Sequence, residues 1–147
     1  MIIETSDRLF LDTGFVQARF SRRDQYHTAA LQLMNRVETC AELWTTEAVL
    51  LEIGSTFRAP PERVVVPEIC QWLKRQPNRH LVTVSGDLLE RGIALFSQRS
   101  DKAWSLTDCV SFVLMQDQQL TDALTCDHHF VQAGFRALLL EESESNS

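Results

Sequence analysis

Apolar residues along the chain fall into short continuous runs and longer stretches with helical spacing. The runs predict strands at 8–11, 42–45, 80–84, 123–126 and 135–140. Helical spacing and capping residues predict helices at 15–20, from 24 onward, 46–57, 62–76, 85–98, 105–115 and 128–133. Strands that alternate with helices form β-α-β units, so the pattern predicts an α/β fold whose mainly parallel sheet is covered on both faces.

Individual residues mark where the predicted helices begin. Asp24, Ser85 and Ser105 each precede an apolar helical stretch and are good N-cap residues. Pro60 and Pro61 break the chain and open the helix predicted at 62–76. These residues place loops between the predicted elements and leave no long linker that would separate two domains.

The length of 147 residues is that of one ordinary domain, and a composition that is 44% hydrophobic and 23% charged is typical of a globular protein. We expect a single domain over 1–140. Three glutamates among the last seven residues predict an acidic, disordered tail over 141–147.

Charge and cysteine content exclude several classes of protein. A net charge of -6 argues against sequence-blind nucleic-acid binding through many lysines and arginines, although a metal site also requires local acidity. The four cysteines form no C-x-x-C pair, which favours free thiols in a reducing compartment over zinc or disulfides. No apolar run is long enough to span a bilayer, and the first residues lack the pattern of a secretion signal. We therefore expect a cytoplasmic protein.

Two aspartates follow predicted strands. Asp12 ends the run Leu9–Leu11, and Asp127 follows the strand that ends at Cys126. Ligands of open parallel sheets bind beyond the carboxyl ends of the strands, which favours a functional site at this edge. Both aspartates are also suited to be helix N-caps, and the local sequence leaves the two interpretations open.

Two further acids lie in predicted helices. Glu52 stands among almost continuous apolar residues, where a buried carboxylate requires a partner such as a metal ion or an arginine. Asp108 completes the capping-box pattern Ser105-x-x-Asp108 in the first turn of a largely apolar helix. A cap and a metal-ligand role are compatible, so both remain open for Asp108.

These four acids can meet at one edge of the sheet. Crowded carboxylates repel one another unless cations lie between them, so a pocket of this kind predicts Mg²⁺ or Mn²⁺. Two such ions about 4 Å apart can activate water and stabilise the leaving oxygen of a phosphodiester. We do not expect His128 and His129 to be ligands, because Mg²⁺ prefers oxygen and adjacent histidines point in different directions. Asp101 is a weaker acidic candidate.

The segments around the four acids resemble the successive motifs of the PIN domain. The matching segments are Leu9-Phe10-Leu11-Asp12-Thr13, Val49-Leu50-Leu51-Glu52, Trp104-Ser105-Leu106-Thr107-Asp108-Cys109 and Ala123-Leu124-Thr125-Cys126-Asp127-His128-His129-Phe130. The resemblance covers nearly the whole chain in the right order, and the segment that matches least well is 59–66.

The resemblance implies a Rossmann-like three-layer α/β/α sandwich and cleavage of RNA that depends on Mg²⁺ or Mn²⁺. It implies that Asp12, Glu52, Asp108 and Asp127 are the catalytic, metal-holding acids, and that Thr13 and Thr107 flank them. A stand-alone chain of this size is similar to VapC-type toxins. That similarity implies RNA as substrate, inhibition by a small antitoxin protein, and a homodimer.

Two alternatives to a nuclease are weighed on the same residues. One is a PIN-like binding or regulatory module whose acidic site docks a basic peptide. The other is an aspartyl-phosphate enzyme, which is disfavoured because Thr13 and Gly14 stand where such enzymes need acids. Arg19, Arg22 and Arg23 could contact RNA if they lie near Asp12, but a solvated loop explains them equally well.

Overall fold

A five-stranded parallel sheet forms the centre of the computed structural model, which describes residues 7–147. The strands are β1 (Arg8–Leu11), β2 (Glu42–Thr46), β3 (Arg79–Val82), β4 (Asp122–Leu124) and β5 (Arg136–Ala137), and their order is β3-β2-β1-β4-β5. All strand pairs within the described residues are parallel. The predicted absence of a secretion signal concerns residues 1–6, which lie outside the described part.

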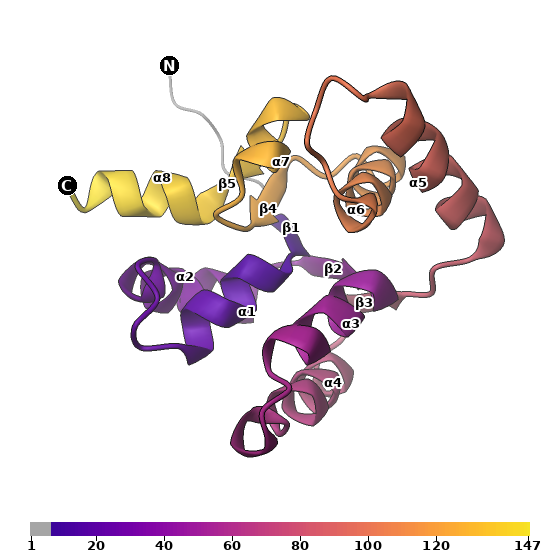
Figure 1. The fold of residues 1–147 in the computed structure, drawn as a ribbon. Helices are drawn as coiled ribbons and strands as arrows, with labels where there is room; N and C mark the ends of the chain where they lie inside the picture. Colours follow the sequence, from indigo (N-terminus) through magenta and orange to yellow (C-terminus); the bar gives the residue numbers. More distant parts are fainter. Residues whose placement is uncertain (1–6) are drawn as a thin grey trace.

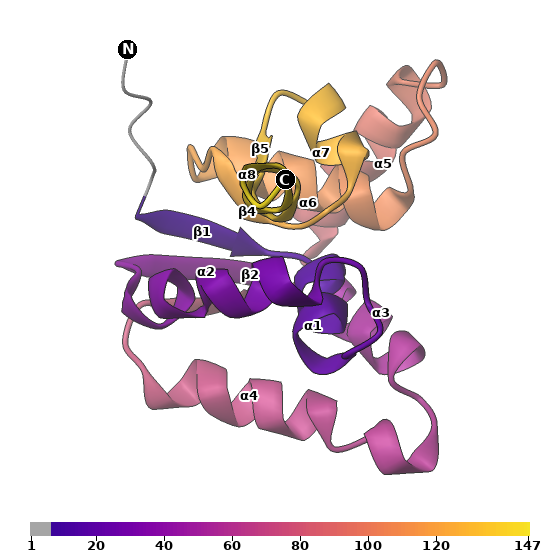
Figure 2. The same cartoon turned by 90° about the vertical axis from the view of Figure 1, so that its left-hand side faces the viewer.

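Helices cover both faces of this sheet (Figure 1). They are α1 (Thr13–Phe20), α2 (His27–Thr39), α3 (Glu47–Thr56), α4 (Val65–Arg75), α5 (Gly86–Gln98), α6 (Leu106–Asp117), α7 (His128–Gln132) and α8 (Leu138–Ser145), with a 3₁₀ turn at Pro60–Glu62. Helix α2 packs against α8, and α5 packs against α6 on the other side of the strands (Figures 1 and 2). The predicted α/β sandwich is confirmed. None of the helices in residues 7–147 has the length and apolar character needed to cross a bilayer.

The centre of the sheet is apolar on both faces. Leu9 and Phe10 of β1 are fully buried, as expected for the middle strand of a parallel sheet. The Phe130 ring of α7 lies 6.2 Å from that of Phe10 and 4.9 Å from that of Phe112 in α6. Because this cluster joins β1, α6 and α7, it fixes the positions at which α6 and α7 begin.

Three helices begin at a serine or threonine whose side chain caps them, and two of these caps, Ser85 and Ser105, were predicted. The side chains of Thr46 and Ser85 accept hydrogen bonds from backbone N–H groups at the starts of α3 and α5. Ser105 and Asp108 form a reciprocal capping box at the start of α6. These bonds satisfy backbone donors that a helix leaves unpaired at its N-terminus.

Two helix starts differ from the prediction. Asp24 does not cap α2; its carboxylate accepts from the backbone N–H of Tyr26 in the preceding turn, and α2 begins at His27. The double proline opens only the 3₁₀ turn, so α4 begins at Val65 and not at Glu62. In both places a turn residue satisfies local backbone groups before the helix proper starts.

The C-terminal segment also differs from the prediction. The last strand was expected over 135–140, but β5 holds only Arg136 and Ala137. Leu138 and Leu139 are buried in α8, which continues to Ser145 and therefore occupies most of the segment predicted as a disordered tail. A short apolar run cannot distinguish a buried strand from the buried face of a helix, which explains the error. Asn146 beyond α8 donates to Gln32 of α2 at 2.8 Å.

Candidate active site

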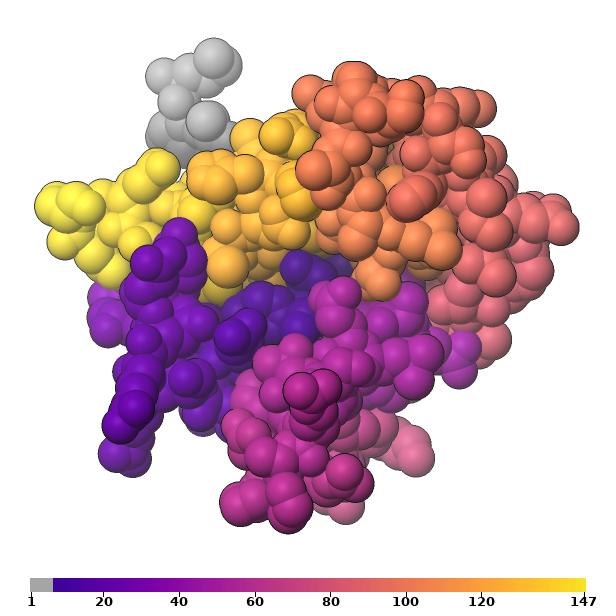
Figure 3. Space-filling model, in the orientation of Figure 1, coloured from indigo at the N-terminus to yellow at the C-terminus, as the bar shows by residue number. Residues whose placement is uncertain are grey.

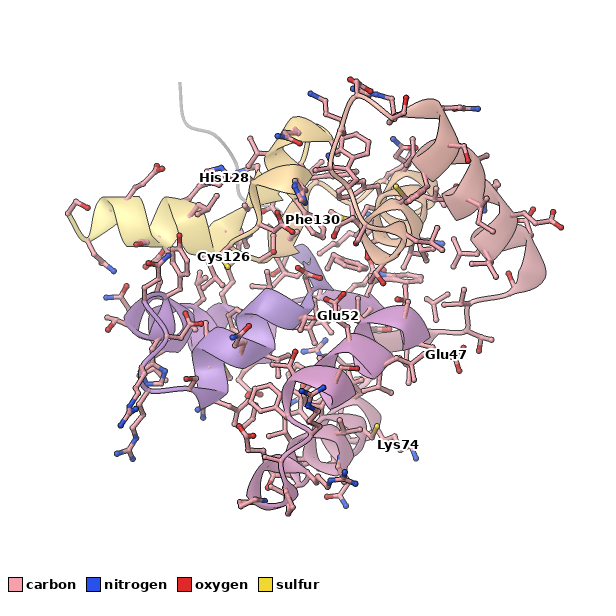
Figure 4. All side chains as sticks on the ribbon, viewed as in Figure 1. Glu47, Glu52, Lys74, Cys126, His128 and Phe130 are labelled. Atoms are coloured by element: carbon pink, nitrogen blue, oxygen red, sulfur yellow. The ribbon has the colours of Figure 1, made fainter. Side chains whose placement is uncertain are left out.

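Four acidic side chains lie near the carboxyl ends of the central strands. Asp12 directly follows β1, and Asp127 comes three residues after the end of β4. Glu52 lies in α3, the helix that follows β2, and Figure 4 places it near the middle of the molecule. In the space-filling view, the indigo segment after β1 is recessed between α3 and the orange segments of α6 and α7 (Figure 3).

Asp12 occupies the N-cap position of α1 but does not cap it. Its side chain makes no capping hydrogen bond, although it is only 6% exposed. Asp12 Oδ2 instead accepts a hydrogen bond from the Thr125 hydroxyl at 2.8 Å. The N-cap interpretation of Asp12 is therefore not realised, and its carboxylate remains available for another role.

Burial and neighbouring charge act on this carboxylate together. The pKa of Asp12 is raised from 3.8 to about 7, chiefly by burial and also by the charges of Glu52 and Asp108. The Thr125 hydrogen bond acts in the opposite direction, because it stabilises the ionised form. Glu52 and Asp108 are thus close enough to Asp12 to repel its charge, although they come from different helices.

The side chain of His129 contacts the carboxylates of both Asp108 and Asp127. His129 Nδ1 is 3.1 Å from Asp108 Oδ2 and 3.3 Å from Asp127 Oδ1. Both carboxylates also cap helices: Asp108 accepts from Ser105 N, and Asp127 accepts from His129 N at 2.8 Å. One donor atom from each of the three side chains lies within 4.8 Å of the other two, so the group is able to hold one metal ion.

Thr125 connects the two halves of this acidic group. Its hydroxyl donates to Asp12 and accepts from the backbone N–H of Asp127 at 3.1 Å. Thr125 is fully buried, so its hydroxyl orientation is fixed by these two bonds. It therefore holds Asp12 beside the turn that carries Asp127.

The four acids differ from other carboxylates of the described residues in having no lysine or arginine partner. Among residues 7–147, no lysine or arginine forms an ion pair with Asp12, Glu52, Asp108 or Asp127. Buried acids elsewhere are paired: Asp122 lies 2.7 Å from Arg36. The arginine that was the alternative partner for Glu52 is thus absent from the described site.

The structure also places the other candidate residues that were identified from the sequence. Thr13 is buried beside Asp12, and its hydroxyl has no hydrogen-bond partner among the described residues. Thr107 is half-buried in the first turn of α6. Asp101 is exposed and paired with Arg99 at 3.0 Å, which lowers the Asp101 pKa. Arg22 and Arg23 are exposed between α1 and α2.

Thr125 is not predicted from the sequence to belong to the site, and His129 is not expected to be a ligand. The argument that adjacent histidines diverge was correct, since His128 is exposed while His129 turns toward the acids. The signal that could have identified His129 is its position two residues after the N-cap Asp127, whose side chain bonds the His129 backbone. Thr125 directly follows β4 and continues the buried run of Ala123 and Leu124, where a buried hydroxyl needs a partner.

The fold was compared with solved structures. VapC20 of Mycobacterium tuberculosis, a toxin that cleaves the sarcin–ricin loop, superposes with a TM-score of 0.74 at 21% sequence identity, over 86% of this chain and 95% of that one. The chain has a PIN-like fold. No protein-family model matches the sequence, and no curated protein matches it significantly. The PIN-like resemblance of the sequence motifs is thus supported at the level of the fold.

Proposed function

We propose that this protein is a metal-dependent ribonuclease that hydrolyses RNA phosphodiester bonds at the site of Asp12, Glu52, Asp108 and Asp127, called the notch below. The observation that carries the proposal is that the buried Asp12 carboxylate neither caps its helix nor forms an ion pair with any lysine or arginine of residues 7–147. Two more carboxylates, Glu52 and Asp108, act on its charge. An uncompensated buried charge is unfavourable by several kcal/mol or more, roughly, so the arrangement is suited to a cation.

The residues fit a divalent ion such as Mg²⁺ or Mn²⁺. Asp12, Glu52, Asp108 and Asp127 would hold it, since carboxylate oxygens are the ligands these ions prefer. A bound ion would activate water near neutral pH and neutralise charge on the phosphate. Within the chain, Thr125 orients Asp12, and Ser105 orients Asp108 by a backbone hydrogen bond. The aromatic cluster around Phe130 holds α6 and α7, the helices at whose starts Asp108 and Asp127 lie.

The PIN-like neighbour is a toxin, and we extend that role to this chain as the toxin of a type II toxin–antitoxin pair with RNA as substrate. A groove of about 260 Å³ between α1, α2 and α4 supports a small protein partner. It is lined by Leu11, which precedes Asp12, by the apolar side chains Phe15 and Trp72, and by charges of both signs including Arg19. A bound antitoxin segment in this groove would lie next to the notch. The four free cysteines fit a reducing compartment such as the cytoplasm.

A second copy of the chain is the other partner we propose. Leu89, Ile93 and Phe96 are 39%, 46% and 44% exposed and share one face of α5 by their spacing. An apolar stripe of this kind on a helix is suited to a symmetric helix contact. Replacing Ile93 by Lys should shift the protein from dimer to monomer in light scattering, whereas a dimer that is unchanged would place the contact elsewhere.

The nuclease proposal is tested by cleavage of a sarcin–ricin loop oligonucleotide and of total RNA. The metal-stripped protein should cleave after addition of Mg²⁺ or Mn²⁺, and EDTA should stop the reaction. Asp12→Asn should lose at least about a hundredfold in rate, because the variant removes a charge that the metal requires. Asp101→Asn is the matched control, because Asp101 is an exposed acid that pairs with Arg99.

The outcomes separate the alternatives. Cleavage that persists in EDTA, or that is equal in Asp12→Asn, would overturn the proposal and indicate a contaminating nuclease. Tight binding of a basic peptide without cleavage of any RNA would favour the binding module. Total RNA is included to reveal substrates other than the loop.

A further inference from the structure

The strongest unassigned feature of the notch is the imidazole of His129. Among residues 7–147, it is the one imidazole in the three-residue group with Asp108 and Asp127, and its Nδ1 atom faces both carboxylates. His128, the preceding residue on the same helix, is exposed and takes no part in the cluster. The difference follows from helix geometry, because consecutive residues lie about 100° apart around a helix axis.

The spacing of the three donor atoms matches that of neighbouring ligands around one ion. Metal–ligand bonds of about 2.1 Å at right angles place adjacent donors about 3 Å apart. The distances from His129 Nδ1 to the two carboxylate oxygens are 3.1 and 3.3 Å. No rearrangement of the backbone is therefore needed for these atoms to share an ion.

The surrounding hydrogen bonds hold the three donors in place. Asp108 Oδ2 accepts from Ser105 N, and Asp127 Oδ1 accepts from His129 N. The Asp127 backbone N–H is itself bound by the Thr125 hydroxyl. Ligands that are fixed by such outer contacts lose little entropy when a metal binds. Their mutual geometry is thus a property of the fold.

We infer that His129 is a metal ligand of the proposed nuclease site, and that it makes the site select Mn²⁺ and later first-row metals over Mg²⁺. Imidazole suits Mn²⁺, Co²⁺ and Ni²⁺ increasingly well along the series, whereas Mg²⁺ prefers oxygen and keeps its waters. This inference rests on the proposed function and replaces the all-oxygen site expected from the sequence. In the metal-bound site, Nδ1 binds the ion and Nε2 carries the proton.

The experiment measures metal binding to the full-length, metal-stripped protein, with no RNA present. Calorimetric titrations with Mg²⁺, Mn²⁺ and Co²⁺ are run on the wild type and on two matched variants, His129→Asn and His128→Asn. His129→Asn should bind Mn²⁺ and Co²⁺ at least about tenfold more weakly, since replacing even a residue that only supports a ligand lowers metal affinity by about this much. Its Mg²⁺ affinity should fall less than about twofold, because water replaces the nitrogen. His128→Asn should match the wild type for all three metals.

A spectroscopic measurement keeps the inference testable if His129→Asn folds poorly. Electron spin-echo spectra of the Mn²⁺-loaded wild type should show coupling to a histidine nitrogen, and His128→Asn should retain it. Absence of that coupling in the wild type would overturn the inference. So would a His129→Asn variant that binds Mn²⁺ normally, or one that loses Mg²⁺ and Mn²⁺ in equal proportion, since equal loss indicates that His129 only orients the carboxylates.

The same data distinguish failure of this inference from failure of the proposed function. A wild type that binds Mg²⁺ and cleaves RNA without nitrogen coupling to Mn²⁺ would overturn only the role of His129. A wild type that binds no divalent ion would overturn the nuclease proposal as well.

Discussion

Asp12 should destabilise the metal-free protein at neutral and alkaline pH. Its carboxylate is buried, and the folded protein raises its pKa from 3.8 to about 7. A group that binds its proton more tightly in the folded state stabilises the fold below its unfolded pKa. That stabilisation is lost as the pH rises through the folded pKa, because the ionised group must then stay buried. Asp12→Asn, which cannot ionise, removes this dependence.

The magnitude follows from the displacement of the Asp12 pKa. One pKa unit corresponds to about 1.4 kcal/mol. The rise from 3.8 to about 7 therefore corresponds to about 4 kcal/mol of lost stability above the folded pKa. Asparagine keeps an oxygen to accept from Thr125, so the variant should recover most of this amount. At about pH 5, less than half of this difference should be present.

The assay is urea unfolding of the wild type and of Asp12→Asn in EDTA, at about pH 5 and about pH 8, with Asp101→Asn as the exposed control. The variant should have a higher free energy of unfolding than the wild type, and this difference should be clearly larger at the higher pH than at the lower one. Adding Mn²⁺ at about pH 8 should stabilise the wild type and leave Asp12→Asn nearly unchanged. A stability difference that is the same at both pH values would refute the reasoning, since Asp12 would then carry no burial penalty.

Two further predictions concern the support of the site and the packing of the fold. Thr125→Val removes the hydroxyl that stabilises ionised Asp12, so it should lose about 1.5–3 kcal/mol of stability and raise the pH midpoint of RNA cleavage. Thr125→Ser should restore both the stability and the midpoint. An unshifted pH profile of the valine variant would contradict this role. Gly92→Ala should lower the free energy of unfolding in urea by about 1–3 kcal/mol, because its new β-carbon would lie 2.6 Å from Val110 Cγ2. Gly86→Ala, at the open start of the same helix, should be neutral or stabilising. Equal effects of the two substitutions would show that α5 and α6 adjust freely.

The sequence predicts elements best where local chemistry and tertiary packing agree. Ser85 and Ser105 cap α5 and α6 at the predicted positions, since each hydroxyl serves a backbone donor that every helix leaves free. The C-terminal segment was mispredicted because the run ending in Leu138–Leu140 suits a strand and a buried helix face equally. Its outcome depends on contact with α2, which is distant in sequence.

The candidate site shows a similar division between local and non-local information. Asp12, Asp108 and Asp127 all stand where helices begin, so capping explains each of them from the sequence alone. The structure separates them by what their side chains do: Asp108 and Asp127 cap their helices, while Asp12 leaves α1 uncapped and turns to Thr125. Thr125 is far from Asp12 along the chain, and only the pairing of β1 with β4 brings the two together.

The position of His129 follows from the same topology. The Asp127 cap sets where α7 starts, and the packing of Phe130 on Phe10 and Phe112 sets how α7 is rotated. With both fixed, His129 faces Asp108 and His128 faces solvent. A sequence shows two equivalent histidines, because the rotation of α7 is decided by an aromatic cluster drawn from β1, α6 and α7 itself. The polar chemistry of the notch is thus specified by apolar packing behind it, and changes in that packing should alter metal binding without touching a ligand.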